Sequence, residues 1–252
     1  MRETVTGLVL TLNGERLLEK CLTSLDFCDE LLVVDSGSSD RTREIAEACG
    51  ARIIVNPWPG PVAQFALALA QVRTDWVVSL DQDEYLTDEL RQTIVARLAM
   101  QEQVAGYYVS RSSFYFNRFM KHSGWYPDLL LRVFRLGRME VSASGAHYHF
   151  TPQGETGRLA GDIHHYPYES FRQHMDKINY YAEEGAKALR EKGRRGGPAA
   201  ALLHGAGRFL KLYLLKLGLL DGKAGFYNAM AGFYYAFQKY VRIEETNKWG
   251  NN

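Results

Sequence analysis

Apolar residues in the first hundred positions form short runs that alternate with segments in which apolar residues recur at helical spacing. The short runs predict four strands, at Val5–Leu12, Glu30–Asp35, Ala51–Val55 and Trp76–Leu80. The intervening segments predict helices at Glu15–Leu22, Arg41–Cys49 and Val62–Val72. Strands and helices that alternate in this way build a mostly parallel sheet with helices on both faces. The pattern therefore predicts an α/β fold of the Rossmann-like kind.

The pattern changes after Gly106. Tyr107–Arg111 alternates like an exposed strand, and Leu131–Arg135 alternates like an edge or antiparallel strand. Beyond Tyr166 the apolar residues return to helical spacing, which predicts helices at Phe171–Arg190, Leu202–Leu220 and Phe226–Val241. We therefore expect a sheet domain at residues 1–165 and a C-terminal amphipathic helical region at residues 166–252.

Charge separates the same two parts of the chain. The net charge is +1, but residues 1–163 carry 16 Lys and Arg against 21 Asp and Glu, and residues 164–252 carry 14 against 8. His204, Arg208 and Lys211 follow helical spacing along one face, as in an interfacial helix. The basic helices are expected to bind a membrane surface; the alternative is that they pack on each other or on a partner chain in a homo-oligomer. Basic residues interrupt Leu202–Leu220, so it is a poor transmembrane span.

The three cysteines, Cys21, Cys28 and Cys49, have no metal-binding spacing and are odd in number. Neither a zinc site nor a disulfide framework is indicated, and a reducing compartment is the simplest interpretation. The apolar run near the N-terminus lacks the features of an export signal. These observations favour a cytoplasmic location.

Two predicted strands end in acidic residues. The fourth runs directly into Asp81-Gln82-Asp83-Glu84, and ligands bind at the carboxyl ends of strands in open α/β sheets. Two of these carboxylates can reach one hard cation; the alternative is an acidic turn that caps a helix beginning near Thr87. The second strand ends at Asp35, beside a Ser/Gly-rich turn at a helix N-terminus that can bind an anion or a nucleotide. Asp35 as a plain turn residue is the alternative there.

Aromatic residues gather around a further acid in Gly124-Trp125-Tyr126-Pro127-Asp128. Rings and carboxylates together suit a sugar-binding surface, although they suit an ordinary core equally well. Four histidines, at positions 147, 149, 164 and 165, match no metal motif, but one of them could be a ligand.

These motifs, in this order and spacing, resemble the family-2 glycosyltransferases. The resemblance runs from about Val5 to Tyr240. Within the family, the sequence most resembles the bacterial branch that adds a sugar, often β-linked glucose, to the inner core of lipopolysaccharide. It rests on Thr11-Leu12-Asn13, Val33 to Asp40, Pro57-Trp58, Gln64, Ser79 to Glu84, Gly124 to Asp128, Leu131 to Phe134, His147 and Leu219 to Gly225.

The resemblance implies a GT-A fold and a metal-dependent inverting transfer from a nucleotide sugar, expected to be a UDP-hexose. It implies a lipopolysaccharide-core or other lipid-linked glycan as acceptor, an enzyme peripheral on the inner face of the cytoplasmic membrane, and no nucleic-acid partner. A divalent cation, Mg²⁺ or Mn²⁺, would offset the charge that grows on the departing diphosphate.

Site roles follow from the same resemblance. The donor would contact Thr11, Asn13, Asp35, Ser36, Gln64 and Asp81, with Asp35 at the base and Asp81 near the ribose or the metal. The metal ligands would be Asp83, Asp81 and His147. Asp128 would be the general base, and Arg132 would hold a phosphate or position Asp128.

The chain departs from the family pattern at four places. It has Gly14 where an acid is usual, Phe65-Ala66 in place of Lys-Asn, Leu130 in place of a frequent Gln, and Tyr148 in place of a common Glu. These departures leave the donor sugar open. They keep two alternatives in view: a catalytically weak or inactive glycan- or membrane-binding scaffold, and a sugar nucleotidyltransferase. A sugar nucleotidyltransferase would need a Gly-rich basic loop after the first strand to bind a triphosphate, and this sequence shows none there.

Overall fold

The computed structural model describes residues 2–144 and 147–245, and for residues 143, 144 and 147 the backbone alone. The chain forms two compact units. Unit 1 comprises residues 1–112 and 128–165, and unit 2 comprises residues 113–127 and 166–252.

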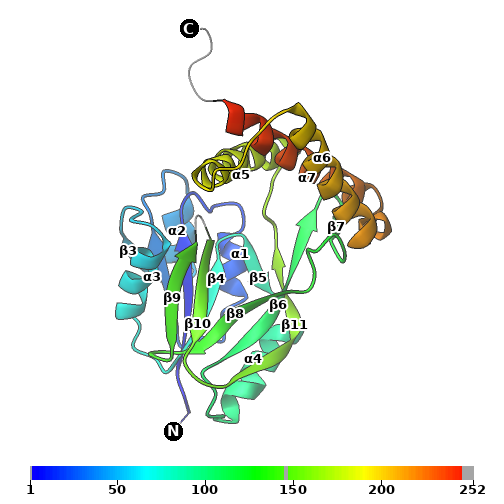
Figure 1. Ribbon diagram of the computed structural model, residues 1–252. Helices are drawn as coiled ribbons and strands as arrows, with labels where there is room; N and C mark the ends of the chain where they lie inside the picture. The colour runs from blue at the N-terminus through cyan, green and yellow to red at the C-terminus, as the bar shows by residue number, and fades with distance from the viewer. Residues whose placement is uncertain (1, 145–146, 246–252) are drawn as a thin grey trace. The chain divides into compact units, whose positions relative to one another are not determined.

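Unit 1 is built on a sheet whose strands follow the order β3-β2-β1-β4-β8-β6-β11-β5 in the described chain (Figure 1). Its first four strands pair in parallel: β3 (Arg52–Val55), β2 (Glu30–Asp35), β1 (Val5–Thr11) and β4 (Trp76–Asp81). Parallel pairing brings their carboxyl ends to one edge of the sheet, where Thr11 pairs with Asp35 and Leu10 pairs with Asp81. The predicted α/β class and its four parallel strands are confirmed.

Beyond β4 the sheet continues with β8 (Asp128–Arg135), β6 (Gly106–Tyr115), β11 (Thr156–His165) and the short β5 (Glu84–Leu86). β8 runs antiparallel to both β4 and β6, as expected for Leu131–Arg135. The prediction that Tyr107–Arg111 is an exposed strand is wrong, because β6 lies inside the sheet and Tyr107 is only 2% exposed.

Both faces of the sheet are covered. α1 (Leu18–Thr23), α2 (Thr42–Ala48) and α4 (Asp88–Ala99) pack on one face. α3 (Pro61–Ala70) and the hairpin of β9 (Met139–Ser144) and β10 (His147–Pro152) pack on the other. Alternate side chains of β1 divide between the two cores, with Val5 and Val9 in the first and Leu8 in the second. The expected placement of helices on both faces is therefore confirmed.

The N-terminus of α4 shows which residue caps this helix. The hydroxyl of Thr87 accepts a hydrogen bond from the backbone N–H of Leu90 at 3.3 Å, as an N-cap residue does. Glu84 lies in β5, a strand that the sequence pattern did not predict. The acidic turn is therefore not the cap of this helix, and its carboxylates must be explained in another way.

Unit 2 is mainly helical. Its elements are β7 (Arg118–Phe119), which pairs with the end of β6, and α5 (Phe171–Glu191), α6 (Pro198–Leu210), a π-helical turn η1 (Lys211–Leu215), a 3₁₀ turn η2 (Gly218–Asp221) and α7 (Gly222–Glu244). The predicted helix at Leu202–Leu220 is thus broken after Leu210, and Leu217 takes a left-handed conformation with φ of 54°. None of the helices within the described ranges combines the length and the apolar character of a membrane span.

Candidate active site

The acidic motif after β4 folds back on itself. The backbone N–H of Asp81 donates a hydrogen bond to Oε2 of Glu84 at 3.0 Å, and the Glu84 side chain is completely buried. A buried carboxylate of this kind is stable only when positive charge or hydrogen-bond donors face it. The structure supplies both from the antiparallel half of the sheet.

Arg132 of β8 lies between the two carboxylates. Its Nη2 donates to Oδ2 of Asp81 at 2.6 Å and to Oε1 of Glu84 at 3.0 Å. The guanidinium is almost fully buried, with 4% of its side chain exposed. Because β8 pairs directly with β4, the register of the sheet places this arginine at the acidic edge. Its location and contacts do not resemble those of an exposed phosphate-binding arginine.

Tyr148 of β10 completes the surroundings of Asp81. Its hydroxyl accepts a hydrogen bond from Nη1 of Arg132 at 2.5 Å and donates one to Oδ1 of Asp81 at 2.7 Å. Both oxygens of Asp81 are therefore engaged within the protein. The ring of Tyr148 packs against Phe65, with centroids 4.6 Å apart, so two of the departures from the family pattern touch each other.

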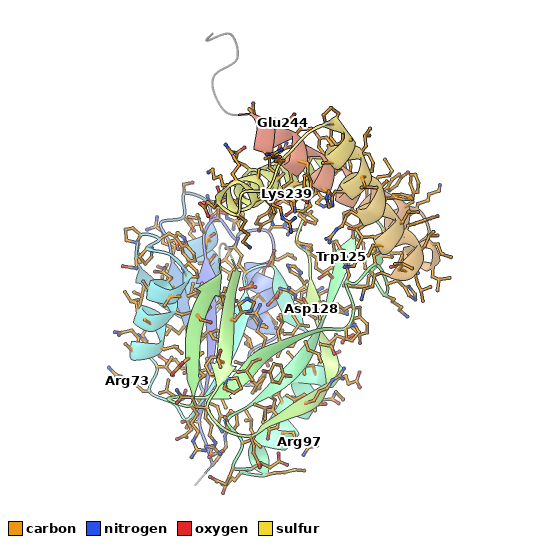
Figure 2. The ribbon with its side chains drawn as sticks, in the orientation of Figure 1. Arg73, Arg97, Trp125, Asp128, Lys239 and Glu244 are labelled. Carbon is orange, nitrogen blue, oxygen red and sulfur yellow. The ribbon has the colours of Figure 1, made fainter. Side chains whose placement is uncertain are left out.

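A second arginine, Arg111 of β6, joins Asp128 to this cluster. Its Nε and Nη2 donate to Oδ2 of Asp128 at 2.9 and 2.7 Å, and its Nη1 donates to Oε1 of Glu84 at 3.0 Å. Arg111 and Asp128 are cross-strand partners in the β6–β8 register. Asp128 stands at the start of β8 (Figure 2), and 38% of its side chain is accessible, close to the 34% of Asp81.

The charges in this network shift one another's ionisation. Partial burial opposes ionisation of Asp81, whose side chain is 34% exposed, but Arg132 and the Tyr148 hydroxyl outweigh it and hold the pKa of Asp81 well below its ordinary value. Burial raises the pKa of Glu84, and the nearby charge of Asp81 adds to the rise. Burial also raises the pKa of Tyr148 well above its usual range, which keeps its proton available for Asp81.

Asp83 lies apart from the two arginines. Its Oδ2 is 3.6 Å from Nε2 of His165 in β11, and 26% of its side chain is exposed. Among the described residues no group of three His, Cys, Asp or Glu side chains forms a metal cage. A magnesium ion, however, is commonly held by one or two carboxylates together with substrate phosphates, so an accessible Asp83 fits a cation that arrives with a diphosphate. The side chain of His147 lies outside the described residues.

Side-chain amides connect three segments here: Gln82 of the acidic motif contacts the loop after β1, and Asn13 of that loop contacts the loop after β2. Gln82 Oε1 accepts from the hydroxyl of Thr11 at 2.7 Å and from the backbone N–H of Leu12 at 2.8 Å. Asn13, whose φ is 52°, accepts from the N–H of Ser39 at 2.9 Å through its Oδ1. The Thr11 and Asn13 side chains thus fix the shape of this edge.

Asp35 and Gln64, which are buried, and Ser36, which is half-buried, form a polar group at the end of β2. Asp35 is fully buried and accepts hydrogen bonds from both the N–H and the hydroxyl of Ser38. Gln64 Nε2 donates to the hydroxyl of Ser36 at 3.3 Å, and its Oε1 accepts from Asn56 at 2.7 Å. The structure brings these three predicted donor residues together, with Asp35 engaged in its own turn.

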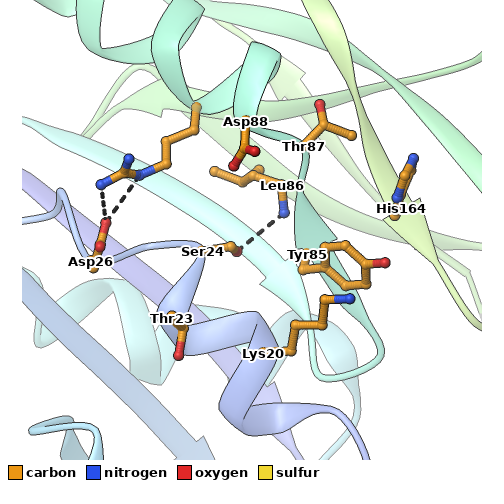
Figure 3. A pocket seen from close by; sticks show the side chains of 10 residues that line it. Lys20, Thr23, Ser24, Asp26, Tyr85, Leu86, Thr87, Asp88 and His164 are labelled. Carbon is orange, nitrogen blue, oxygen red and sulfur yellow. Dashed lines mark hydrogen bonds and ion pairs between the residues drawn. The ribbon is translucent and has the colours of Figure 1, made fainter.

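One cavity of unit 1 lies elsewhere, between α1, β5 and the start of α4 (Figure 3). It has a volume of about 580 Å³, and the ring of Tyr85 lies in it beside Lys20 and His164. None of the predicted site residues is among the described residues that line it. The candidate site is therefore the polar edge of the sheet and not this cavity.

Sequence reasoning found the acids and Arg132 but missed Arg111, and it treated Tyr148 only as a departure. Arg111 carries no local signal, since its partner Asp128 is 17 residues away and meets it only through strand pairing. One sequence feature could have drawn attention to it. Arg111 ends an alternating run, and the antiparallel strand that follows in the chain begins with an acid, Asp128.

Residues 8–153, more than half of the chain, match the sequence model of the family described as Glycosyl transferase family 2. The chain belongs to this family. The expected family and the enzyme class of glycosyltransferase are thereby confirmed, and the α/β sheet described above agrees with the GT-A expectation.

Similar proteins support the same assignment. A lipopolysaccharide core biosynthesis glycosyltransferase, LpsC, from Rhizobium meliloti (strain 1021) is 28% identical, and the match covers 95% of this chain and 91% of the relative. An uncharacterized glycosyltransferase, RT0209, from Rickettsia typhi is 27% identical over 95% of this chain and 85% of its own length.

Among solved structures, glucosyl-3-phosphoglycerate synthase from Mycobacterium tuberculosis, crystallised with Mn²⁺, uridine diphosphate and glucosyl-3-phosphoglycerate, is 29% identical in the matched part. That match covers 45% of this chain and 44% of the synthase chain, with a TM-score of 0.37. A likeness of this extent carries no inference about this protein.

Proposed function

We propose that this protein is a metal-dependent, inverting hexosyltransferase that moves a sugar from a UDP-linked donor to a hydroxyl of a lipopolysaccharide-core or other lipid-linked glycan. Family membership supports the reaction class, and similarity to a protein named for lipopolysaccharide core biosynthesis supports the class of acceptor. The observation that carries the site is the pairing of Asp128 with Arg111 in the cluster that also holds the acidic motif.

Asp128 is proposed as the general base. Both contacts from Arg111 go to Oδ2, so Oδ1 is the atom assigned to take the proton of the acceptor hydroxyl. The acceptor oxygen then forms a bond to the anomeric carbon as the bond to the nucleoside diphosphate breaks, which inverts the configuration. Arg111 fixes the direction of the carboxylate, and a base must lie within hydrogen-bond reach of the proton that it removes.

Asp83 is proposed as the carboxylate that holds the divalent cation, with Asp81 and His147 as the remaining expected ligands. When bound, the cation would offset the negative charge that builds on the departing diphosphate. Because both Asp81 oxygens are engaged by Arg132 and Tyr148, Asp83 carries the main part of this role.

Arg132 is proposed as a positioning residue. It is buried and contacts protein carboxylates, so it holds Asp81 and Glu84 in place instead of touching the donor. The contacts of Thr11, Asn13, Asp35, Ser36 and Gln64 shape the edge of the sheet on which we propose the nucleotide to lie.

The test is a panel of nucleotide sugars in thermal-shift and turnover assays, with and without Mn²⁺. A donor that binds the folded protein raises its melting temperature by an amount that grows with the logarithm of the donor concentration divided by its dissociation constant. Asp128→Asn should keep the donor-dependent shift but lower kcat by about 10²–10⁴-fold, the usual size of a lost general base. Asp83→Asn should lose both the Mn²⁺-dependent shift and turnover.

Glu89→Gln is the matched control, because Glu89 is an exposed acid in the first turn of α4 and its replacement removes the same charge. This variant should behave like the unsubstituted protein. Full turnover by the Asp128→Asn variant would refute the proposed base. Donor binding that ignores metal, without turnover on any donor, would favour a binding scaffold instead.

A further inference from the structure

The helical hairpin of unit 2 buries small residues and exposes large ones. α6 and α7 run side by side (Figure 1), and their contact is made through glycines. A Cβ atom at Gly205 would lie 2.9 Å from the ring of Phe233, and one at Gly232 would lie 2.5 Å from the side chain of Leu212. In water-soluble helices the large apolar residues normally face the partner helix, whereas small residues line helix contacts in lipid.

Most leucines of the hairpin point outward, whereas Leu212 is buried against Gly232. Leu203, Leu210 and Leu214 recur at i, i+7 and i+11, opposite the buried face marked by Ala201 and Gly205. We call the exposed set the leucine ridge: it consists of Leu203, Leu210, Leu214, Leu215, Leu219 and Leu220, which are 43–78% exposed. A set of exposed leucines this large on one short segment favours an interaction site over a surface that faces only water.

The break in the helix extends the ridge. The π-helical turn η1 and the left-handed Leu217 end the regular helix, and η2 continues as a short turn before α7. Leu215, the most exposed leucine of the hairpin at 78%, lies in this irregular segment. The connection between α6 and α7 thus presents apolar side chains where a soluble hairpin normally has polar ones.

The segment that carries the leucine ridge is rich in positive charge. Residues 192–243 contain nine Lys and Arg and a single acid, Asp221. That acid is 1% exposed and accepts hydrogen bonds from the backbone N–H groups of Lys121 at 3.2 Å and His122 at 2.9 Å. By contrast, Lys211, Lys216 and Lys223 are all exposed on the segment that carries the ridge.

We propose that the leucine ridge inserts into the interface of an anionic lipid bilayer, with Lys211, Lys216 and Lys223 at the level of the phosphate groups. Apolar side chains next to lysines match the two layers of a bilayer surface, acyl chains and anionic headgroups. A second copy of the chain fits less well, because a two-fold interface would bring the same positive surfaces together without acids to pair them. The proposal rests on unit 2 alone and does not depend on the proposed transfer reaction.

The experiment measures partitioning of the full chain into vesicles by flotation. Vesicles of equal parts phosphatidylglycerol and phosphatidylcholine should bind the protein, and pure phosphatidylcholine vesicles should bind it far less. The variant K211Q/K216Q/K223Q should partition on the order of 100-fold less into the anionic vesicles, since each lysine near such a surface contributes roughly fivefold. Added salt should weaken the binding of the unsubstituted protein, because it screens the headgroup field.

The variant L203S/L215S tests the apolar part. Both leucines are already more than 70% exposed, so their replacement should leave thermal unfolding unchanged while it lowers partitioning at least tenfold. The control variant R41Q/R73Q/R138Q removes three exposed positive charges from unit 1 and should bind vesicles like the unsubstituted protein.

Two results would overturn the proposal. One is failure of the unsubstituted protein to float with anionic vesicles. The other is gel filtration that shows a dimer converted to a monomer by L203S/L215S, with vesicle binding unaffected; the leucine ridge would then be an interface between copies. Loss of vesicle binding in both ridge variants, with the control intact, would support it.

Discussion

Removal of Arg132 is the sharpest test of the charge network. Arg132→Met keeps the length of the side chain but leaves Asp81 and the fully buried Glu84 facing each other without the guanidinium between them. Breaking a buried ion pair by removing one partner costs about 3–5 kcal/mol, because the remaining charge is left uncompensated. For a chain of this size, that corresponds to a fall in melting temperature of about 6–20 °C.

The pH dependence of the stability lost in Arg132→Met identifies the cause of that loss. Burial already raises the pKa of Glu84, and loss of the opposing Arg132 charge should raise it further. A group whose folded-state pKa is raised contributes stability that is lost as pH rises through that pKa. The free energy of unfolding that Arg132→Met loses should therefore be smaller at pH 5 than at pH 7. Adding Glu84→Gln to this variant should recover part of that free energy at pH 7.

The assay is urea denaturation followed by circular dichroism at both pH values. Arg91→Met is the matched control, since Arg91 pairs with Asp26 on the surface, where both side chains are at least 40% exposed. Surface pairs contribute about 0–1 kcal/mol, so this variant should unfold almost like the unsubstituted protein. If the two variants had the same midpoint at pH 7, the network around Arg132 would not stabilise the fold as argued.

Three further substitutions test single features of unit 1 by the same denaturation assay. Y148F removes the hydroxyl that donates to Asp81 and keeps the ring, and it should cost about 1–3 kcal/mol; an unchanged midpoint would contradict the hydrogen bond. T87A removes the N-cap of α4 and should cost about 1 kcal/mol without loss of turnover. G161A should cost several times more than G50A: both glycines have positive φ, but a Cβ at Gly161 would press into the backbone of α4, whereas one at Gly50 meets open space.

The parallel half of the fold was predictable because its signals are local. β2 was predicted with its observed bounds, Glu30–Asp35, since an apolar run that ends in an acid and a turn needs no tertiary context. β5 was missed because three residues are too few to show a period. β6 was misjudged because its alternating polar residues suggest solvent on one side, whereas the fold covers both of its faces.

The site residues also divide into those that have a local sequence signal and those that have none. Asp81, Asp83, Asp128 and Arg132 stand in motifs and were named from the sequence, although their roles remain proposals. Arg111 was not, because only the register of β6 against β8 brings it to Asp128. Pairing between antiparallel strands depends on the whole sheet, and no local pattern of residues around position 111 encodes it.

Two departures from the family pattern make one structural feature. Phe65 of α3 is 1% exposed in the core between this helix and the sheet, where the charge of the Lys usual in the family would be costly to bury, and its ring contacts that of Tyr148. A Glu in place of Tyr148 would set a third carboxylate against Asp81, whereas the Tyr hydroxyl donates to it. Phe65 and Tyr148 therefore form one packed pair, and the Tyr148 hydroxyl holds Asp81 beside Arg132.

The carboxylates of the site therefore differ in the positive charge that faces them. Two guanidiniums, of Arg111 and Arg132, face three acids, which leaves that cluster with one uncompensated negative charge when all are ionised. Asp83 adds a second charge outside the reach of the arginines. When all four acids are ionised, this surplus of two negative charges, one of them on the accessible Asp83, attracts a divalent cation and would repel a bare diphosphate. We therefore expect donor binding to require the cation even though the arginines are close by, and donor affinity that stayed constant on titration with a chelator would contradict this electrostatic account.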